Sequence, residues 1–236
     1  MIKLLIFALV TSIEADYDST FHAVLNEVMN YTFREMYDNA KVLSDSLIAL
    51  RPNDPLPHLI LAGLYDYYML DYSTNELDDA FKMEIETVFE LTERYKESDP
   101  SKYHYFRGLA YAYRATRAGR KRSLISAFKD GLRARKELRK AIELDSTLYD
   151  AYLPLGIFDY ALSEAPKFIR WLMGSEDRRE QGINEVRLAA EKGWITKVPA
   201  KHALVWMLAY YGRTREAVKI ARELVQEYPT SRSFRW

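Results

Sequence analysis

Apolar residues recur at spacings of three and four along most of this chain, which is the pattern of amphipathic helices. The clearest stripes are Ala40, Leu43, Leu47 and Leu50; Leu132, Leu138, Ala141, Ile142 and Leu144; and Ile183, Val186 and Ala190. Strand-like alternation of useful length is absent from the sequence, and 9 glycines and 8 prolines are few for 236 residues. The pattern therefore predicts long helices joined by short connections.

Prolines and polar turn residues divide these stripes into units of similar length. Pro52, Pro100 and Pro229 each follow a helical stretch, and Ser146 and Gly193 stand at two further breaks. The stretch before Pro52 reads Leu-Ile-Ala-Leu-Arg-Pro, and similar tails end at Ser146 and Pro229. A helix end that repeats in this way is typical of a helical array. The predicted units are 17–52, 55–100, 103–146, 149–193 and 197–229.

At this level of detail the units resemble the tetratricopeptide repeat (TPR), a pair of helices with a large residue, Leu, a small residue and an aromatic residue on the first helix. The matching positions are His58, Leu61, Ala62 and Tyr65; Phe106, Leu109, Ala110 and Tyr113; and Tyr152, Leu155 and Gly156, with Asp159 in place of the aromatic residue. The second-helix pattern is most complete at Gly212, Ala217, Ala221, Leu224 and Pro229. The resemblance implies an all-α, right-handed superhelical solenoid of about five TPR-like helix pairs over 16–236.

The small residues have a physical role in such a fold, because they let two helices approach closely. Ala62, Ala110 and Gly156 are expected to approach the partner helix, and Ala40, Ala134, Gly182 and Ala217 are expected to receive it. The units depart from the family in length: the breaks lie about 46 to 48 residues apart, against 34 in the usual repeat. In this respect the chain is similar to long-helix bacterial envelope members, loosely related to a eukaryotic outer-membrane and lipid-droplet clearance family.

The first fifteen residues have a different pattern. Lys3 precedes an apolar run at 4–10, and Ala15 offers a small residue for cleavage. This predicts a signal peptide over 1–15 and a periplasmic or secreted protein. The alternative is a first amphipathic helix that caps the array, in which case the protein is cytoplasmic.

The sequence contains none of the common catalytic or metal-binding motifs. There is no cysteine, the histidines at 22, 58, 104 and 202 lack metal-ligand spacing, and His58 is expected to be a satisfied packing residue. Neither a phosphate-binding glycine loop nor a nucleophile elbow occurs. Formal net charge is +0, so no global field favours nucleic acid. We therefore expect no catalysis, cofactor or metal.

Charge is unevenly distributed between two predicted helices. Residues 71–100 carry ten acidic and three basic side chains, whereas 114–140 carry eleven basic and two acidic ones. The basic stretch could form a surface for an acidic peptide, a lipid headgroup or nucleic acid. The favoured interpretation is that the two helices are neighbours and neutralise each other.

An apolar segment interrupts the fourth unit at 166–174. Its large side chains are Phe168, Ile169, Trp171, Leu172 and Met173. The segment could be an exposed anchor for a partner or a membrane surface. Equally, it could fold back over the core of the array.

In TPR-like solenoids the first helices line a groove that binds partners. The resemblance places these residues on that face: Asp66, Tyr67, His104, Arg107, Tyr111, Arg114, Asp150 and Tyr160. Tyrosine and arginine dominate many interfaces, and an arginine can clamp a carboxylate, although the tyrosines could instead pack between helices. The leading hypothesis is a non-catalytic scaffold of the bacterial envelope for a protein or peptide. The alternative is a peripheral membrane factor that uses 166–174 and the basic helix 114–140.

Overall fold

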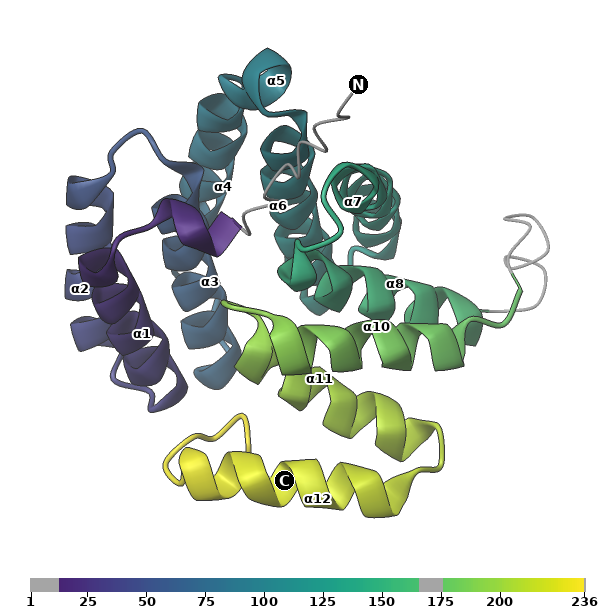
Figure 1. The fold of residues 1–236 in the computed structure, drawn as a ribbon. Coiled ribbons are helices and arrows are strands. Elements are labelled where there is room, and N and C mark those ends of the chain that lie inside the picture. Colours follow the sequence, from purple (N-terminus) through teal and green to yellow (C-terminus); the bar gives the residue numbers. More distant parts are fainter. Residues whose placement is uncertain (1–12, 166–175, 236) are drawn as a thin grey trace, which may run out of the picture.

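The computed structural model describes residues 13–165 and 176–235. Within these residues the secondary structure is helical, without strands, and is arranged as five antiparallel helix pairs (Figure 1). The pairs are α1 (Ser19–Phe33) with α2 (Tyr37–Leu50), α3 (Pro55–Asp71) with α4 (Asp78–Thr92), α6 (Pro100–Arg120) with α7 (Leu124–Leu144), α8 (Tyr152–Glu164) with α10 (Arg179–Lys192), and α11 (Lys197–Tyr210) with α12 (Thr214–Glu227). A short helical turn at Ile13–Asp16 (η1) precedes the first pair, and two more, at Tyr95–Ser98 (α5) and Tyr149–Ala151 (η2), lie between pairs.

The Asp-Pro pairs that end one unit also begin the next. Asp54 Oδ1 accepts the N–H of Leu56 at 2.9 Å, and Asp99 Oδ1 accepts the N–H of Lys102 at 3.2 Å. A proline occupies the first turn of α3 and of α6, where its missing N–H costs no hydrogen bond. Both helices therefore start at a residue that the sequence specifies.

Small residues lie where the two helices of a pair approach each other. Ala40, Ala62 and Ala110 are completely buried. In the α8–α10 pair, a Cβ added to Gly156 would collide with the carbonyl oxygen of Gly182, and a Cβ added to Gly182 would collide with that of Gly156. This is the packing expected from the sequence, and the predicted all-α helical repeat fold is confirmed.

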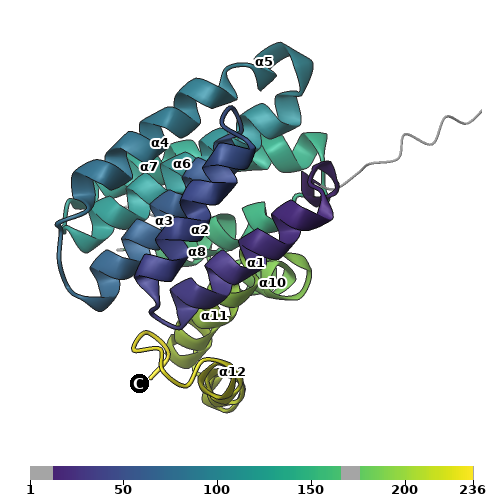
Figure 2. The same cartoon turned by 90° about the vertical axis from the view of Figure 1, so that its left-hand side faces the viewer.

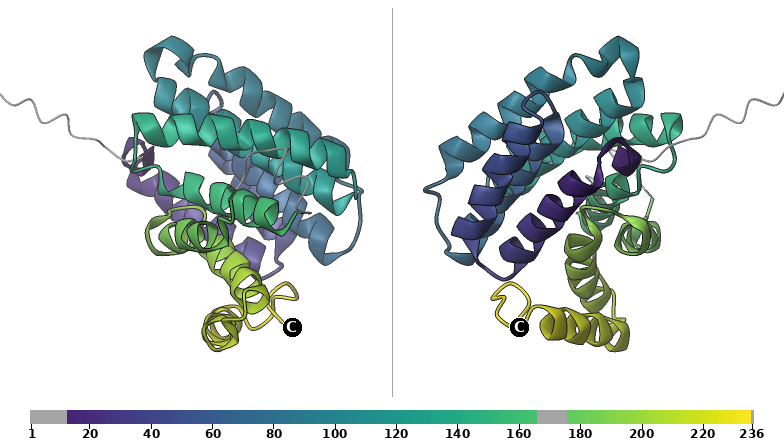
Figure 3. Two further views of the ribbon diagram at one scale, coloured as in Figure 1. Left: turned by 90° about the vertical axis from the view of Figure 1, so that its right-hand side faces the viewer. Right: turned by 60° about the vertical axis from the view of Figure 1, so that its left-hand side comes forward.

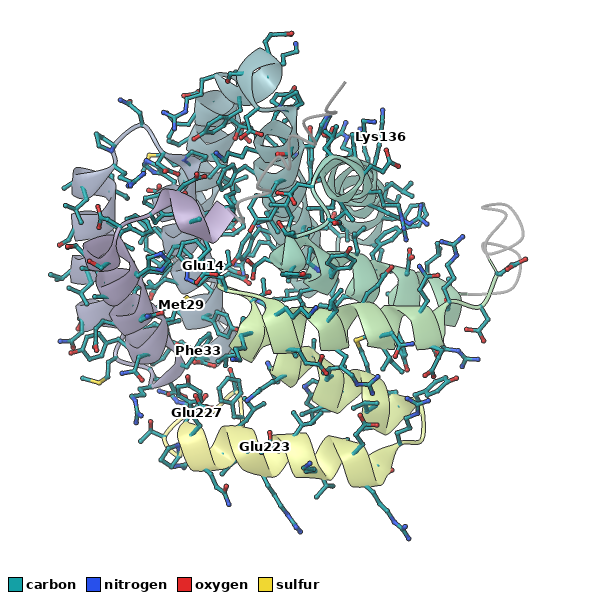
Figure 4. All side chains as sticks on the ribbon, viewed as in Figure 1. Glu14, Met29, Phe33, Lys136, Glu223 and Glu227 are labelled. Atoms are coloured by element: carbon teal, nitrogen blue, oxygen red, sulfur yellow. The ribbon has the colours of Figure 1, made fainter. Side chains whose placement is uncertain are left out.

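The array closes on itself, because α12 and residues 228–235 return to α1. Views from several sides show the C-terminal segment beside the end of α1 (Figures 2 and 3). Phe33 packs against Tyr228 and Phe234 with ring centroids 5.5 and 6.0 Å apart, and Phe234 is completely buried. Arg232 Nε lies 2.7 Å from Glu35 Oε2. Figure 4 shows Phe33 on the edge of α1 that faces α11 and α12.

Two sequence predictions fall largely outside the described residues. Of the predicted signal peptide, only 13–15 are described, and Ile13 belongs to the same buried core as Tyr17. The apolar segment 166–174, with Phe168, Ile169, Trp171 and Leu172, lies outside them. Among the described residues, no helix has the length and apolar character needed to cross a membrane.

Candidate functional site

A cavity of about 410 Å³ lies between the first helices of the pairs, on what we call the inner face. Helices α1, α3, α6, α8 and α11 contribute most of its lining. The lining is mainly apolar and includes Met29, Phe33, Leu64, Ile157, Phe158 and Pro199. Volume and composition are those of a small-molecule site, which typically spans roughly 300–1,000 Å³ and is lined by apolar side chains with a few polar groups.

An ion pair between α3 and α6 is the main polar feature of this lining. Arg120 Nη1 lies 2.5 Å from Asp66 Oδ2, and the side chain of Asp66 is 5% exposed. Within the described residues, Asp66 Oδ1 is buried and has no hydrogen-bond partner. Burial raises the pKa of Asp66, and the Arg120 charge acts against that shift.

Two tyrosines stand beside the pair. Tyr67 and Tyr113 line the cavity, and their hydroxyls make no hydrogen bond within the described part of the chain. Burial raises the pKa of both phenols, so they remain neutral donors at physiological pH. Tyr113 fits here because it packs against Gly63, where any Cβ would collide with the phenol. We call Asp66, Tyr67, Tyr113 and Arg120 the polar cluster.

His202 of α11 also lines the cavity in its neutral form. Burial, followed by the nearby Arg120 charge, lowers the pKa of His202 to about 4. Trp206 Nε1 donates a hydrogen bond to His202 Nε2 at 3.2 Å, which requires an unprotonated Nε2. The cavity therefore combines hydrogen-bonding capacity with a balanced charge.

Of the eight predicted groove residues, only Asp66 and Tyr67 line this cavity. Arg107 and Arg114 stack instead on Phe89 of α4, at 5.4 and 5.8 Å from its ring centroid. Tyr111 lies in the same stack, 4.8 Å from Phe89 between ring centroids. The structure therefore does not bring these residues together with Asp66, because they lie on the side of α6 that contacts α4 and α7.

The remaining predicted residues use their polar atoms inside the fold. His104 Nδ1 lies 2.6 Å from Glu137 Oε2 of α7. Asp150 Oδ1 accepts hydrogen bonds from the N–H groups of Trp194 and Thr196, both at 2.9 Å. The Tyr160 hydroxyl donates to the Met207 carbonyl at 3.2 Å. The structure does not bring these residues to the cavity either, since Asp150 holds the α10–α11 loop and Tyr160 joins α8 to α11.

Sequence reasoning does not select three of the polar residues that surround the cavity. By pattern alone, Tyr113 is a packing aromatic residue, Arg120 is one member of the basic stretch, and His202 is a histidine without metal spacing. Each of them lies on the first helix of a pair, so the repeat pattern could have indicated that they face inward. Their convergence depends on the curvature that brings α3, α6 and α11 together, and no local pattern encodes it.

The favoured interpretation of the charge pattern is only partly correct, because the basic stretch 114–140 is divided between the end of α6 and most of α7, and the acidic helix α4 packs against α6. Arg117 Nε and Lys121 Nζ of the basic stretch lie 2.9 and 2.7 Å from the Asp78 carboxylate on α4. Burial opposes ionisation of Asp78, but these hydrogen bonds hold its pKa well below the usual range. Arg135 and Arg139 of α7 likewise contact Asp159, at 2.7 and 2.6 Å. Much of the basic charge is thus neutralised within the protein, while Lys136 projects from the outside of α7 (Figure 4).

His58 is satisfied as expected, with Nδ1 2.7 Å from Glu84 Oε2. Among the described residues, no group of three or more His, Cys, Asp or Glu side chains is arranged to hold a metal ion.

Comparison with known proteins finds likeness among solved structures. No family model matches the chain, and no curated protein matches it. Among solved structures, the chain is similar to a thermophilic TPR protein of Thermus thermophilus, at 16% identity and a TM-score of 0.49, over 91% of this chain and 94% of that one. The helix pairs and their close glycine contacts show an all-helical repeat over the described residues.

Proposed function

We propose that this chain is a non-catalytic binding scaffold whose ligand occupies the cavity on the inner face. The observation that carries the proposal is the cavity itself, an apolar space of about 410 Å³ with one cluster of polar side chains. Concave, mainly apolar spaces of this size with a few polar groups are the usual form of ligand sites in proteins.

A protein or peptide partner that places apolar side chains in the cavity fits this proposal. A location in the bacterial envelope also belongs to it, and its support is the apolar run at 4–10 with Ala15. Absence of catalysis is part of the same proposal, since the polar cluster offers an ion pair and two phenols but no nucleophile paired with a base.

The test is the uptake of a neutral apolar fluorophore, N-phenyl-1-naphthylamine. The wild type is expected to bind the dye saturably with one site per chain. Ala115→Phe projects a ring into the cavity from α6 and should abolish uptake. Ala209→Phe is the matched control, because Ala209 is exposed on α11 and does not line the cavity. Absence of saturable uptake, or equal loss in both variants, would contradict the proposal.

A second candidate function, association with a membrane surface, is favoured by the start of α7. Leu124 and Ile125 are 73% and 86% exposed, and Phe128 is 37% exposed. The exposed cations Arg122 and Lys129 stand next to these side chains. Apolar residues flanked by cations suit an anionic lipid surface.

Flotation with vesicles containing phosphatidylglycerol tests this candidate. Ile125→Glu should reduce recovery in the floating fraction severalfold. Val42→Glu is the control, because Val42 is 65% exposed on α2, in another pair. If wild type and Ile125→Glu float equally, or neither floats, the membrane candidate is removed.

A further inference from the structure

The closed array limits what can reach the cavity. In an open solenoid the gap between the first and last units admits an extended chain, but here residues 228–235 occupy it. Ser231 is 2% exposed and Phe234 is completely buried, between α1 and α11. The ion pair of Arg232 with Glu35 fastens the same junction. A short ligand therefore suits this cavity better than an extended peptide that runs along the whole inner face.

The lining also has two chemical characters. Ile157, Phe158 and Pro199 offer apolar surface on α8 and α11. The polar cluster belongs to α3 and α6 and is held together by the contact of Arg120 with Asp66. A ligand that satisfies both surfaces has an apolar part and one polar group, which is the definition of an amphiphile.

The charge balance of the cluster decides the nature of that polar group. Asp66 and Arg120 already compensate each other, so a charged headgroup would introduce an unpaired charge into a largely apolar space, which is costly. Hydrogen-bonding capacity remains, because the hydroxyls of Tyr67 and Tyr113 have no partner within the described residues. Asp66 Oδ1 is a further unpaired acceptor in that part of the chain.

From this arrangement we propose that the cavity binds a neutral, hydroxyl-bearing, single-chain amphiphile, with its headgroup against Asp66, Arg120, Tyr67 and Tyr113 and its chain along α8 and α11. The proposal rests on the binding function above and names its ligand class. An alkyl glycerol ester has this chemistry. A fatty acid anion and an alkylammonium ion do not.

Displacement of bound N-phenyl-1-naphthylamine by three ligands that each carry a ten-carbon chain tests the headgroup. The ligands are 1-decanoylglycerol, decane-1-sulfonate and decylammonium, used below their micelle concentrations at pH 7. The glycerol ester should displace the dye at a concentration at least about tenfold lower than either ion, which corresponds to about 1.4 kcal/mol. Equal or better displacement by either ion would overturn the assignment.

Two variants alter the charge balance in opposite directions. Asp66→Asn leaves Arg120 unpaired, so the sulfonate should gain about tenfold relative to the ester. Arg120→Gln leaves Asp66 unpaired, so decylammonium should gain instead. Each preference is a ratio measured on one folded sample, with circular dichroism as the check on folding. If a variant does not fold, the wild-type order of the three ligands decides alone.

The outcomes separate the two proposals. If the wild type takes up no dye, the cavity is not a binding site and both proposals fail. If the dye binds and Ala115→Phe abolishes uptake, but no amphiphile displaces it or the ions compete best, the binding function stands and the ligand class is wrong.

Discussion

The two sides of α6 differ in what they do with the same residue type. On the inner face, Arg120 pairs with Asp66 beside an apolar cavity. On the opposite side, Arg107 and Arg114 stack on Phe89 and pair with Glu93 and Asp130. Among the described residues, the large cavity lies on the inner side. An arginine at an exposed first-helix position therefore says little about binding until it is known which neighbour it faces.

The largest loss of stability is expected at the contact between α7 and the next helix pair, which a buried carboxylate makes with two arginines. Asp159 is completely buried in α8 and contacts Arg135 and Arg139 of α7. Asp159→Ala should lower the free energy of unfolding by about 4 kcal/mol, because the arginines lose their compensating charge. Urea denaturation of wild type and variant measures this difference in the free energy of unfolding.

Asp79→Ala is the control for this change. Its carboxylate also contacts a cation, Lys82, but the side chain is 97% exposed. The expected loss is below about 1 kcal/mol. Similar losses in both variants would mean that burial does not set the strength of these contacts.

The next largest loss of stability is expected at the junction where residues 228–235 close the array. Phe234→Ala removes a buried ring from the junction with Phe33 and Tyr228 and should cost about 3 kcal/mol. It should also weaken dye binding, since the tail no longer closes the array. Tyr210→Ala removes a ring that is 79% exposed on α11 and does not line the cavity, so it should change neither quantity much. A loss of stability in Phe234→Ala with unchanged dye affinity would show that closure does not shape the cavity.

These contrasts explain which parts of the fold the sequence predicted. Helix starts depend on local chemistry, and Asp54-Pro55 and Asp99-Pro100 specify them within a few residues. The glycine pair Gly156 and Gly182 was recognisable for the same reason, since a repeat places small residues at a fixed register. Local patterns of this kind can be read from a single chain.

The site could be predicted only in part. The repeat pattern placed Asp66 and Tyr67 on the inner face. The structure does not place Asp150 with them, because this residue lies in the turn η2, where its carboxylate accepts the N–H groups of Trp194 and Thr196. Closure by residues 228–235 depends on contacts between the two ends of the chain, which helical periodicity does not report.

A smaller effect is expected from the neutral histidine of the inner face. The pKa of His202 is lowered to about 4 by burial and Arg120, with Asp71 acting against the shift. The unfolded chain binds this proton below about pH 6.5 and the folded chain does not, so acidification destabilises the fold. From pH 8 to pH 5 the loss should be about 2 kcal/mol.

His202→Gln isolates this contribution. The difference in unfolding free energy between wild type and variant, measured in urea at each pH, should fall as pH falls from about 6.5 toward 4. A difference that stays constant over that range would show that His202 titrates alike in the folded and unfolded chain.

The smallest effect is expected on the outer side of α6. Arg107→Ala removes a guanidinium that lies 5.0 Å from the ring centroid of Tyr103 and pairs with Glu93, which is half exposed. The expected loss of stability is about 1 kcal/mol, because a solvent-screened pair and an aromatic contact each contribute little. Dye affinity and the order of the three amphiphiles should not change, whereas Arg120→Gln should change that order. If Arg107→Ala altered headgroup preference as much as Arg120→Gln, the two sides of α6 would not be functionally distinct, and the polar cluster could not be what selects the ligand.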